Sequence, residues 1–315
     1  MIELKGVTKV YGNRVGIHNI TLTVNRGEIV GLLGTNGAGK TTTMRIIAGY
    51  MPPTSGEVRV AGFDVLKEPR EVKRRVGYLP EIPPVYPDMT VRTFLEFVAK
   101  MKSVPRARQR TVVSETIERV GLSEVADRLI GNLSRGYRQR VGIAQAILAE
   151  PDVLILDEPM TGLDPKQIVE IRQLIQNLAR NRTVLFSSHI LLEVTVLCDR
   201  VAIINRGRLV AQGTPAELSR LLRGRRRLHL EVDGVQDKVV AALKAVPGVA
   251  GVEVRGGRGS IHNYVVESGD EDVRRAVFRA LAAIDAPLLR MEQEAVTLEK
   301  VFLELVARDS LSGVG

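Results

Sequence analysis

The sequence predicts an α/β domain with a mainly parallel sheet, followed by a smaller α+β domain. Short runs rich in β-branched residues alternate with helical patterns, which is typical of strands and helices around a parallel sheet. The runs are GEIVGLLG, RRVGYLP, DVLILDEP, RTVLFSSH and RVAIINRG, and the helical patterns cover residues 41–49, 91–102, 134–149, 167–180 and 190–197. The stretch VLIL is apolar throughout, as expected of a strand that is buried on both faces. A length of 315 residues is enough for one large domain and one smaller domain.

Two regions depart from this alternation. The segments IELKGV and HNITLTVN, near the start of the chain, alternate apolar and polar residues, which indicates an antiparallel β edge. From about residue 80 to residue 150, strand patterns are missing and helical patterns dominate. We therefore expect a helical insertion within the sheet of the first domain.

The first domain is expected to cover residues 1–222. The segment GTPAEL indicates the start of a helix, with Thr214 as its N-cap, Pro215 at the first helical position and Glu217 closing a capping box. We expect the domain to end just beyond this helix. A linker rich in arginine should follow, with Arg223, Arg225, Arg226 and Arg227.

The second domain, residues 223–315, is predicted to be a small α+β unit that regulates or dimerises the protein. Residues 228–291 give the order strand, helix, strand, strand, helix, strand, which is typical of a ferredoxin-like fold. A further helix is expected in TLEKVFLELV. Its apolar residues share one face that should pack on another surface, and they are Leu298, Val301, Phe302 and Leu305.

The composition is that of an ordinary globular protein with unevenly placed charge. The net charge is +9, but residues up to Leu222 contain 31 basic and 22 acidic residues, whereas the remainder contains 14 of each. A basic first domain suits nucleic acid or the phosphates of a nucleotide, and charge alone leaves both open.

A single cysteine, Cys198, excludes an internal disulfide, and no apolar run fits a membrane span or a signal peptide. We expect a cytoplasmic protein whose membrane role would come from a partner.

A glycine-rich loop between a predicted strand and a predicted helix carries the strongest chemical signal. The segment GTNGAGKT has the full Gly-x-x-x-x-Gly-Lys-Thr pattern, whose glycines let the backbone wrap closely around phosphate. Lys40 is expected to contact the β- and γ-phosphates, and the Thr41 hydroxyl to bind Mg²⁺. The nucleotide-binding residues expected here are Gly34, Thr35, Asn36, Gly37, Ala38, Gly39, Lys40, Thr41 and Thr42.

Acidic residues and a histidine follow two further strands at the sheet edge where ligands bind. The segment VLILDEP delivers Asp157 and Glu158 to the C-terminal end of a buried strand. Asp157 suits Mg²⁺, and Glu158 suits orienting or deprotonating a water molecule. His189 ends the strand TVLFSSH and is expected to contact a γ-phosphate. Asp164, in the tight turn TGLDPKQ, either serves the site or caps a helix.

A second candidate anion site follows almost a hundred residues after the first. In LSRGYRQR, residues 133–140, Ser134 and Gly136 stand where a predicted helix begins and leaves backbone N–H groups unpaired. Ser134 is also expected to cap that helix. One chain therefore carries two candidate phosphate-binding segments.

The order of these motifs resembles the ATP-binding cassette of ABC transporters over about residues 2–222. The phosphate loop, GYLPE, a helical insertion, LSRGYRQR, LILDEP, GLDP and SSHI follow one another as in that family. The resemblance implies a P-loop NTPase fold, hydrolysis of ATP, and ATP and Mg²⁺ as cofactors. Within the family, the chain is most similar to the exporter branch with a C-terminal extension, of the gliding-motility and multidrug-export type.

The resemblance also implies a use for two phosphate-binding segments. In ABC cassettes two subunits dock head to tail, and the signature loop of one covers ATP held by the phosphate loop of the other. Ser134 and Gly136 would then bind the γ-phosphate of ATP on a partner chain, and we expect a homodimer with two shared sites. Tyr11 matches the aromatic residue that stacks on adenine, and Glu81 stands at the Mg²⁺-sensing loop. The apolar helix VRTFLEFVAKMK would face the membrane partner.

Four positions depart from the family pattern. The signature usually reads Leu-Ser-Gly-Gly-Gln, whereas Arg135 and Tyr137 stand at its third and fifth positions. This change affects the contacts of the usual Gln and leaves the expected phosphate contact in place. Glu81 replaces a frequent Gln and can still bind Mg²⁺ or water, and Thr35 replaces a frequent Pro in the variable part of the loop.

We expect an ATPase subunit that powers a separate membrane permease, an exporter, from the inner face of the cell membrane, without a nucleic acid partner. The alternative is a soluble ABC-type ATPase that acts on the ribosome or on nucleic acid, which the basic first domain would permit. Ribosome-acting members usually carry two cassettes in one chain, and DNA-repair members carry a long coiled coil. This chain has one cassette and no heptad run, which favours the transporter.

Overall fold

The computed structural model describes residues 1–220, 226–269 and 271–293. The chain divides into two compact units, of which the first is Met1–Thr214 and the second begins at Pro215. The boundary expected from the sequence, after Leu222, lies slightly later in the chain. Two predicted features lie outside the described residues: the start of the linker, with Arg223 and Arg225, and the helix with Leu298, Val301, Phe302 and Leu305.

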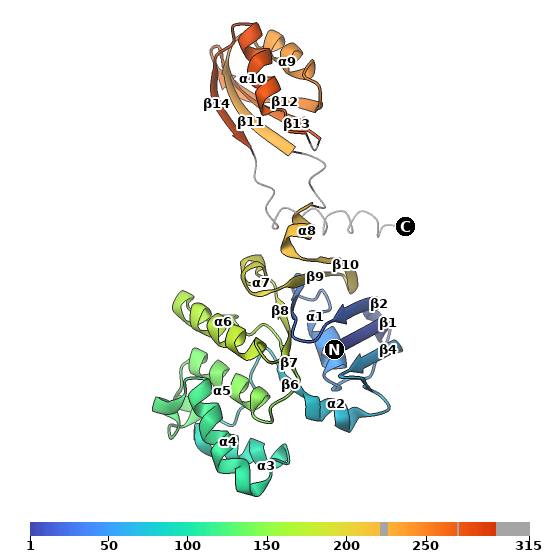
Figure 1. Cartoon of the computed structure of the whole chain (residues 1–315), viewed down its shortest axis with the longest axis vertical. Coiled ribbons are helices and arrows are strands. Elements are labelled where there is room, and N and C mark those ends of the chain that lie inside the picture. Colours follow the sequence, from blue (N-terminus) through green and yellow to red (C-terminus); the bar gives the residue numbers. More distant parts are fainter. Residues whose placement is uncertain (221–225, 270, 294–315) are drawn as a thin grey trace. The chain divides into compact units, whose positions relative to one another are not determined.

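A six-stranded sheet organises the first unit (Figure 1). Five neighbouring strands run parallel, and the sixth, β10, pairs antiparallel with β9. In spatial order the strands are β10 (Arg208–Gly213), β9 (Arg200–Asn205), β3 (Ile29–Leu33), β8 (Thr183–Ser188), β7 (Val153–Leu156) and β6 (Val76–Leu79). Every residue of β7 and β8 is buried, because both faces of the sheet are covered. The predicted parallel sheet is confirmed.

The predicted antiparallel edge is a separate four-stranded sheet. Its strands are β2 (Arg14–Val24), β1 (Ile2–Tyr11), β4 (Ser55–Val60) and β5 (Phe63–Asp64), and all neighbours pair antiparallel. The helix α1 (Lys40–Ile47) shares one hydrophobic core with both sheets, through Met44, Ile46 and Ile47. The helix that begins with the phosphate-loop lysine is therefore anchored on two sides.

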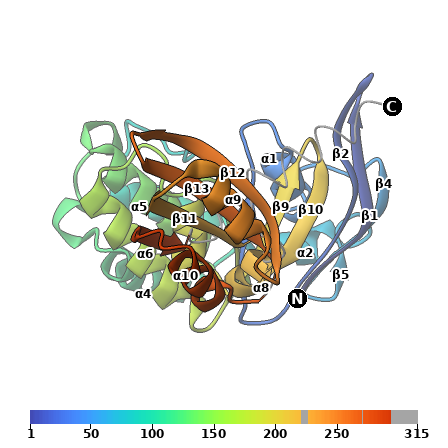
Figure 2. The ribbon, with the colours of Figure 1, turned by 90° about the horizontal axis from the view of Figure 1, so that it is seen from above.

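The helical insertion lies on the opposite side of the parallel sheet from β1 and β2 (Figure 1 and Figure 2). It contains α3 (Val91–Met101), α4 (Arg106–Arg119) and α5 (Arg135–Ile147), with 3₁₀ turns at Ser123–Val125 and Ile130–Asn132. Thr90 caps α3 by accepting a hydrogen bond from the Thr93 N–H. Phe94 and Leu95 on the buried face of α3 are at most 1% exposed. As predicted, residues 80–150 contain no strand.

Three further helices complete the first unit: α2 (Pro69–Arg75), α6 (Pro165–Ala179) and α7 (Leu191–Leu197). Among the helices described, none combines the length and the apolar character that crossing a membrane requires.

The second unit has the predicted order of strands and helices after a short helix, α8 (Pro215–Arg220), which begins at the predicted proline. The elements are β11 (Arg226–Asp233), α9 (Gln236–Lys244), β12 (Val249–Arg258), β13 (Ile261–Ser268), α10 (Arg274–Ala283) and β14 (Leu288–Gln293). The strands pair antiparallel in the order β12-β13-β11-β14. Leu230, Tyr264 and Val277 belong to one core that both helices share with the sheet. Arg226 and Arg227, which we assigned to the linker, instead begin β11.

Candidate nucleotide-binding site

The loop between β3 and α1 is shaped by glycines at its two ends. Gly34 follows β3 directly, and a Cβ atom there would lie 2.3 Å from the carbonyl oxygen of Ile204. Gly39 precedes α1 with a φ of +107°, a left-handed conformation that disfavours residues with a side chain. A Cβ atom on Gly39 would also lie 2.7 Å from Cγ2 of Ile17. Close packing at Gly34, and the backbone conformation together with the Ile17 side chain at Gly39, therefore favour glycine at both ends of the predicted phosphate loop.

Lys40, the first residue of α1, points its ammonium into the curve of this loop. Nζ donates hydrogen bonds to the carbonyl oxygens of Gly34, at 2.7 Å, and Thr35, at 3.2 Å. Nζ also lies 3.1 Å from Oε1 of Glu158, and these two side chains are only 6% and 9% exposed. The loop thus holds a nearly buried positive charge opposite the carboxylate that follows β7.

Glu158 is held by contacts to both its backbone and its carboxylate. Its φ is +49°, which is uncommon for a residue with a side chain, and its N–H donates to Oγ of Ser187 at 2.9 Å. Oε2 accepts a hydrogen bond from Oγ1 of Thr161 at 3.0 Å and lies 2.8 Å from Nδ1 of His189. Burial would raise the pKa of Glu158, but the Lys40 ammonium and the His189 contact outweigh burial and hold the pKa below its usual value. The carboxylate is therefore ionised at neutral pH and can accept a proton.

Asp157 lies fully buried beside Glu158 at the end of β7. Its Oδ1 accepts a hydrogen bond from Oγ of Ser187 at 2.6 Å, whereas Oδ2 has no hydrogen-bond partner within the described residues. A buried carboxylate oxygen without a donor is unfavourable unless a cation approaches it. Among the residues that the structure describes, no group of three His, Cys, Asp or Glu side chains could hold a metal ion. Because Mg²⁺ often uses one or two carboxylates plus waters and substrate phosphates, Asp157 fits a Mg²⁺ ion that arrives with a nucleotide.

The turn that carries His189 is braced by α7. Ser188 donates a hydrogen bond to Oε2 of Glu193 at 2.5 Å and accepts one from the Ile190 N–H at 2.9 Å. Burial raises the pKa of Glu193, although the Ser188 hydrogen bond acts in the opposite direction. The His189 side chain itself is 40% exposed, so its ring reaches solvent while the turn beneath it is fixed.

Tyr11, the last residue of β1, offers an aromatic ring that is 43% exposed. Its hydroxyl lies 2.9 Å from Sδ of Met51 and 3.4 Å from Oγ1 of Thr42. A Cβ atom on Gly16 would lie 2.6 Å from a carbon of the ring, so the ring rests against bare backbone. The Tyr11 ring is therefore tied to the first turn of α1 through Thr42.

These groups surround one open pocket of about 520 Å³, a volume typical of small-molecule sites. The predicted residues that line it are Tyr11, Thr35, Asn36, Gly37, Ala38, Gly39, Lys40, Thr41, Thr42, Glu81, Glu158 and His189. Gly34 and Asp157 lie behind the lining, where they contact Lys40 and Ser187. The fold therefore brings together segments that are far apart in the sequence.

Besides Gly34 and Asp157, three predicted residues do not line this pocket: Ser134, Gly136 and Asp164. Ser134 caps α5 by accepting a hydrogen bond from the Tyr137 N–H at 3.4 Å. Asp164 caps α6 by accepting one from the Gln167 N–H at 2.8 Å. A Cβ atom on Gly136 would lie 2.7 Å from Cδ of Gln167, so the first turns of α5 and α6 pack against each other. The second candidate anion segment is thus part of a separate cluster in the same chain.

Arg135 joins the same two segments. Gly162, between Thr161 and the Asp164 cap, has a φ of +72°. A Cβ atom there would lie 2.5 Å from Cζ of Arg135. The arginine that departs from the family signature therefore packs over the turn that follows Glu158.

Several residues of the site were not predicted from the sequence. Arg14, Val15, Gly16 and Thr161 line the pocket, and Ser187 and Glu193 hold its acidic residues and its histidine turn. The serine pair in FSSHI is the signal that could have indicated hydroxyl support next to His189. Arg14 and Gly16 had a weaker signal, since they follow Tyr11 across a short Gly-Asn turn.

Comparison with known proteins gives one consistent family. The family model described as ABC transporter matches residues 17–161. The linearmycin resistance ATP-binding protein LnrL of Bacillus subtilis strain 168 is 32% identical over 309 residues, which cover 98% of this chain and 99% of the relative. The bacitracin transport ATP-binding protein BcrA of Bacillus licheniformis is 36% identical over 85% of this chain and 90% of the relative.

Solved structures agree with this family. An ATP binding subunit of an ABC transporter is 31% identical, with a TM-score of 0.64, over 70% of this chain and 92% of that chain. A dimeric ATP-binding cassette in a post-hydrolysis state, bound to ADP and Pi, is 26% identical, with a TM-score of 0.63, over 68% of this chain and 98% of that chain. The motifs, the pocket they form and these likenesses show that the chain belongs to the ABC transporter family, as an ATP-binding subunit that hydrolyses ATP.

Proposed function

We propose that this chain hydrolyses Mg-ATP in the pocket described above and thereby drives a separate membrane permease that works as an exporter. The observation that carries the proposal is the contact of Glu158 with both Lys40, at 3.1 Å, and His189, at 2.8 Å. These residues follow β3, β7 and β8 at the carboxyl ends of parallel strands, the edge at which α/β sheets bind ligands. A phosphate there would meet a cation, a base and an imidazole at once.

The phosphate loop and three oxygen ligands would bind the nucleotide. Lys40, oriented by two loop carbonyls, would contact the β- and γ-phosphates. The hydroxyl of Thr41 and the carboxylates of Asp157 and Glu81 would hold Mg²⁺, which when bound neutralises charge on these phosphates. The exposed ring of Tyr11 would stack on the adenine.

Glu158 would position the attacking water and accept its proton. Thr161 and His189 engage Oε2, which leaves Oε1, the atom that faces Lys40, for the water. A γ-phosphate would compete with Glu158 for Lys40, and the loss of that partner would raise the basicity of the carboxylate. Because Nδ1 of His189 contacts Glu158, Nε2 is the ring nitrogen that can face the γ-phosphate.

Ser134 and Gly136 would bind the γ-phosphate of ATP held by a second copy of the chain. Ser134 is exposed at the start of α5, and Gly136 follows in its first turn, where it is buried; neither lines the pocket of its own chain. The N-terminus of α5 would present unpaired N–H groups to the phosphate. A head-to-tail homodimer would then contain two ATP sites, each built from two chains.

The helical insertion would dock on the permease. Exposed apolar side chains gather there, with Ile82 82% exposed, Tyr86 52%, Phe97 37% and Met101 71%. The rings of Tyr86 and Phe97 lie 5.8 Å apart, so part of this set forms one apolar surface. Relatives are named for linearmycin resistance, bacitracin transport and Nod factor export, which supports an exporter. The subunit would then work at the inner face of the cell membrane.

The second unit would stabilise the dimer or regulate it. None of the residues proposed for ATP chemistry lies beyond Thr214, and residues after Leu222 are balanced in charge. Removal of the second unit should therefore leave nucleotide binding intact.

Purification from native membranes in mild detergent tests the exporter proposal. We expect a polytopic membrane protein to copurify with the chain. Phe97→Ser should release it while ATP hydrolysis persists, whereas Val169→Ser, at a position on α6 that is 59% exposed, should not. Copurification of ribosomal proteins or nucleic acid in place of a membrane protein would contradict the proposal and support the soluble alternative.

A further inference from the structure

The tip of the helical insertion carries positive charge that ATP hydrolysis does not use. From Phe97 to Ser114 the sequence has no aspartate or glutamate and five basic residues: Lys100, Lys102, Arg106, Arg108 and Arg110. All five are exposed, and none forms an ion pair or a side-chain hydrogen bond within the described part of the chain. We call these five residues the basic tip. Elsewhere in the first unit, many basic residues pair with acids, as Arg92 does with Asp127 and Arg119 with Glu150.

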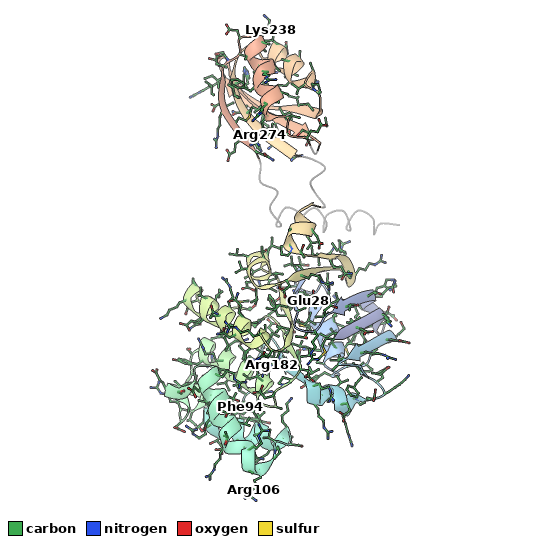
Figure 3. The ribbon with its side chains drawn as sticks, viewed as in Figure 1. Glu28, Phe94, Arg106, Arg182, Lys238 and Arg274 are labelled. Atoms are coloured by element: carbon green, nitrogen blue, oxygen red, sulfur yellow. The ribbon has the colours of Figure 1, made fainter. Side chains whose placement is uncertain are left out.

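The basic tip lies where α3 ends and α4 begins. Lys100 is in the last turn of α3, and Arg106, Arg108 and Arg110 are in the first turns of α4. Figure 3 shows Arg106 at the outer end of the helical insertion, away from the parallel sheet. The five charges are therefore presented together at one extremity of the first unit.

This arrangement works against the stability of α4. The helix has no acidic residue in its first turn, and Pro105 before it provides no side-chain cap. Positive side chains at the N-terminal end of a helix oppose the helix dipole, and Arg106 and Arg110, four positions apart, repel each other. The first turn of α4 thus breaks the usual preferences for capping and charge at a helix start. Natural proteins tend to break such preferences at functional sites.

The basic tip lies next to the apolar surface on which we propose that the permease docks. Phe97 and Met101 stand one turn apart on α3, and Met101 lies between Lys100 and Lys102 in the sequence. Met101 is 71% exposed, so an apolar side chain projects among the cations. With this surface docked on the permease, the basic tip would lie beside the permease at the membrane surface.

We propose that the basic tip binds the anionic headgroups of the membrane beside the permease. The inference rests on the proposed function, which brings the helical insertion to the membrane. Clusters of roughly four to eight Lys and Arg residues next to a membrane attract anionic lipid electrostatically. The Met101 side chain can enter the boundary between headgroups and acyl chains. Binding to lipid would orient the subunit against the permease.

Cosedimentation of the purified full-length chain with lipid vesicles tests this proposal. We expect binding to vesicles of phosphatidylcholine and phosphatidylglycerol and none to phosphatidylcholine alone, with binding lost as salt rises. The tip variant changes Lys100, Lys102, Arg106, Arg108 and Arg110 to Gln, and it should weaken vesicle binding at least about a hundredfold. A second variant, with Arg106→Lys, Arg108→Lys and Arg110→Lys, keeps the charge and should bind as the native chain does.

A matched control removes the same charge elsewhere. It changes five exposed basic residues spread over the first unit to Gln, namely Arg26, Arg59, Lys67, Arg70 and Arg180. This control should bind vesicles as the native chain does. Equal loss in both Gln variants would mean that binding follows net charge, which would overturn the proposal.

Two further measurements, of nucleic acid binding and of phosphate release, test the alternatives. A short RNA or DNA duplex that binds the native chain in a tip-dependent way, at a salt concentration where vesicles do not bind, would assign the tip to nucleic acid instead. Phosphate release in solution should be the same for the native chain and the tip variant. A native chain that released no phosphate would contradict the proposed function and leave the vesicle result to stand on its own.

Discussion

The ammonium of Lys40 lies 3.1 Å from Oε1 of Glu158, so the cation that should bind phosphate is paired with the carboxylate that should activate water. Both side chains are nearly buried, and Thr161 and His189 hold the other carboxylate oxygen. A γ-phosphate that enters the loop must take Lys40 from Glu158. When Lys40 changes its partner from Glu158 to the γ-phosphate, the same event therefore binds the phosphate and frees the carboxylate that acts as the base.

Glu158→Gln should keep ATP binding and nearly stop turnover. A neutral amide can neither accept the proton of water nor compete strongly for Lys40, so ATP should bind at least as tightly as before. We expect phosphate release to fall about 100-fold to 10,000-fold, the range for loss of a general base. Nucleotide titration and a phosphate-release assay give the two values. Glu118→Gln, on the exposed side of α4, serves as the control, and unchanged turnover in Glu158→Gln would remove Glu158 from its assigned role.

The pH dependence of stability should have opposite signs for Glu158 and Glu193. The pKa of Glu158 is lowered in the folded chain from the usual 4.5, so its stabilising effect is full above 4.5 and is lost as pH falls through the folded value. The pKa of Glu193 is raised by burial, so its ionised form destabilises the fold above the raised pKa, and this penalty disappears as pH falls. Chemical unfolding of the native chain, Glu158→Gln and Glu193→Gln over acidic pH measures both differences. Parallel slopes for the two variants would contradict the assigned pKa directions.

ATP should bring two copies of the chain together. Each γ-phosphate would join one phosphate loop to the Ser134 segment of the other copy, and the closed state should persist when Glu158→Gln blocks hydrolysis. Light scattering with Mg-ATP should then give a mass near twice that of the 34.6 kDa chain. ADP lacks the γ-phosphate and should not have this effect on a chain truncated after Leu222. A monomer at high concentration with Mg-ATP would argue strongly against the shared site.

Mixed dimers should reveal whether Ser134 acts on the partner's ATP. Lys40→Ala and Ser134→Arg should each be nearly inactive, because each homodimer has two damaged sites. If the segments act across chains, a mixed dimer places both lesions in one site and leaves the other intact, so mixing should restore part of the phosphate release. Differently labelled chains confirm that mixed dimers form. Confirmed mixed dimers without restored activity would show that Ser134 serves its own chain.

Removal of the residues after Leu222 should leave ATP binding intact. Every residue that lines the pocket lies before position 190, and the second unit has a hydrophobic core of its own. Titration of the truncated chain with nucleotide measures the affinity, and circular dichroism confirms that the truncated chain is folded. Loss of ATP binding in a folded truncated chain would mean that the second unit contributes to the site.

The parts of the site that could be predicted are those set by local sequence. Gly39 and Lys40 stand in a motif whose spacing follows from phosphate geometry, and Asp157 follows a run of apolar residues that is strand-like without any tertiary information. Ser134 and Asp164 are helix caps, which local sequence also indicates. These features needed no knowledge of distant contacts.

The parts that were missed depend on packing between distant segments. Strand β4 begins with Ser-Gly-Glu and is a strand because it pairs with β1, about fifty residues earlier. The role of Ser187 depends on the neighbouring strand β7, which brings Asp157 and Glu158 to its hydroxyl. Glu193 is the exception, because it is only five residues from Ser188; its role depends on the burial of its carboxylate beside the Ser188 hydroxyl, which the local sequence does not reveal. Such contacts join residues of different strands and helices, so they become visible only when the fold is known.

The Tyr11 ring and the phosphate loop are separated by a closely packed layer formed by Gly16, Ile17 and Gly207. The ring rests on Gly16. A Cβ atom on Gly207 would lie 2.7 Å from the carbonyl oxygen of Gly16, and one on Gly39 would lie 2.7 Å from Cγ2 of Ile17. A side chain at Gly16, Gly39 or Gly207 would force the ring and the loop apart, so the spacing between base and phosphates depends on three residues that have none. Substitutions at Tyr11 itself are then expected to change how the base is held, while the glycines keep the length of nucleotide that fits.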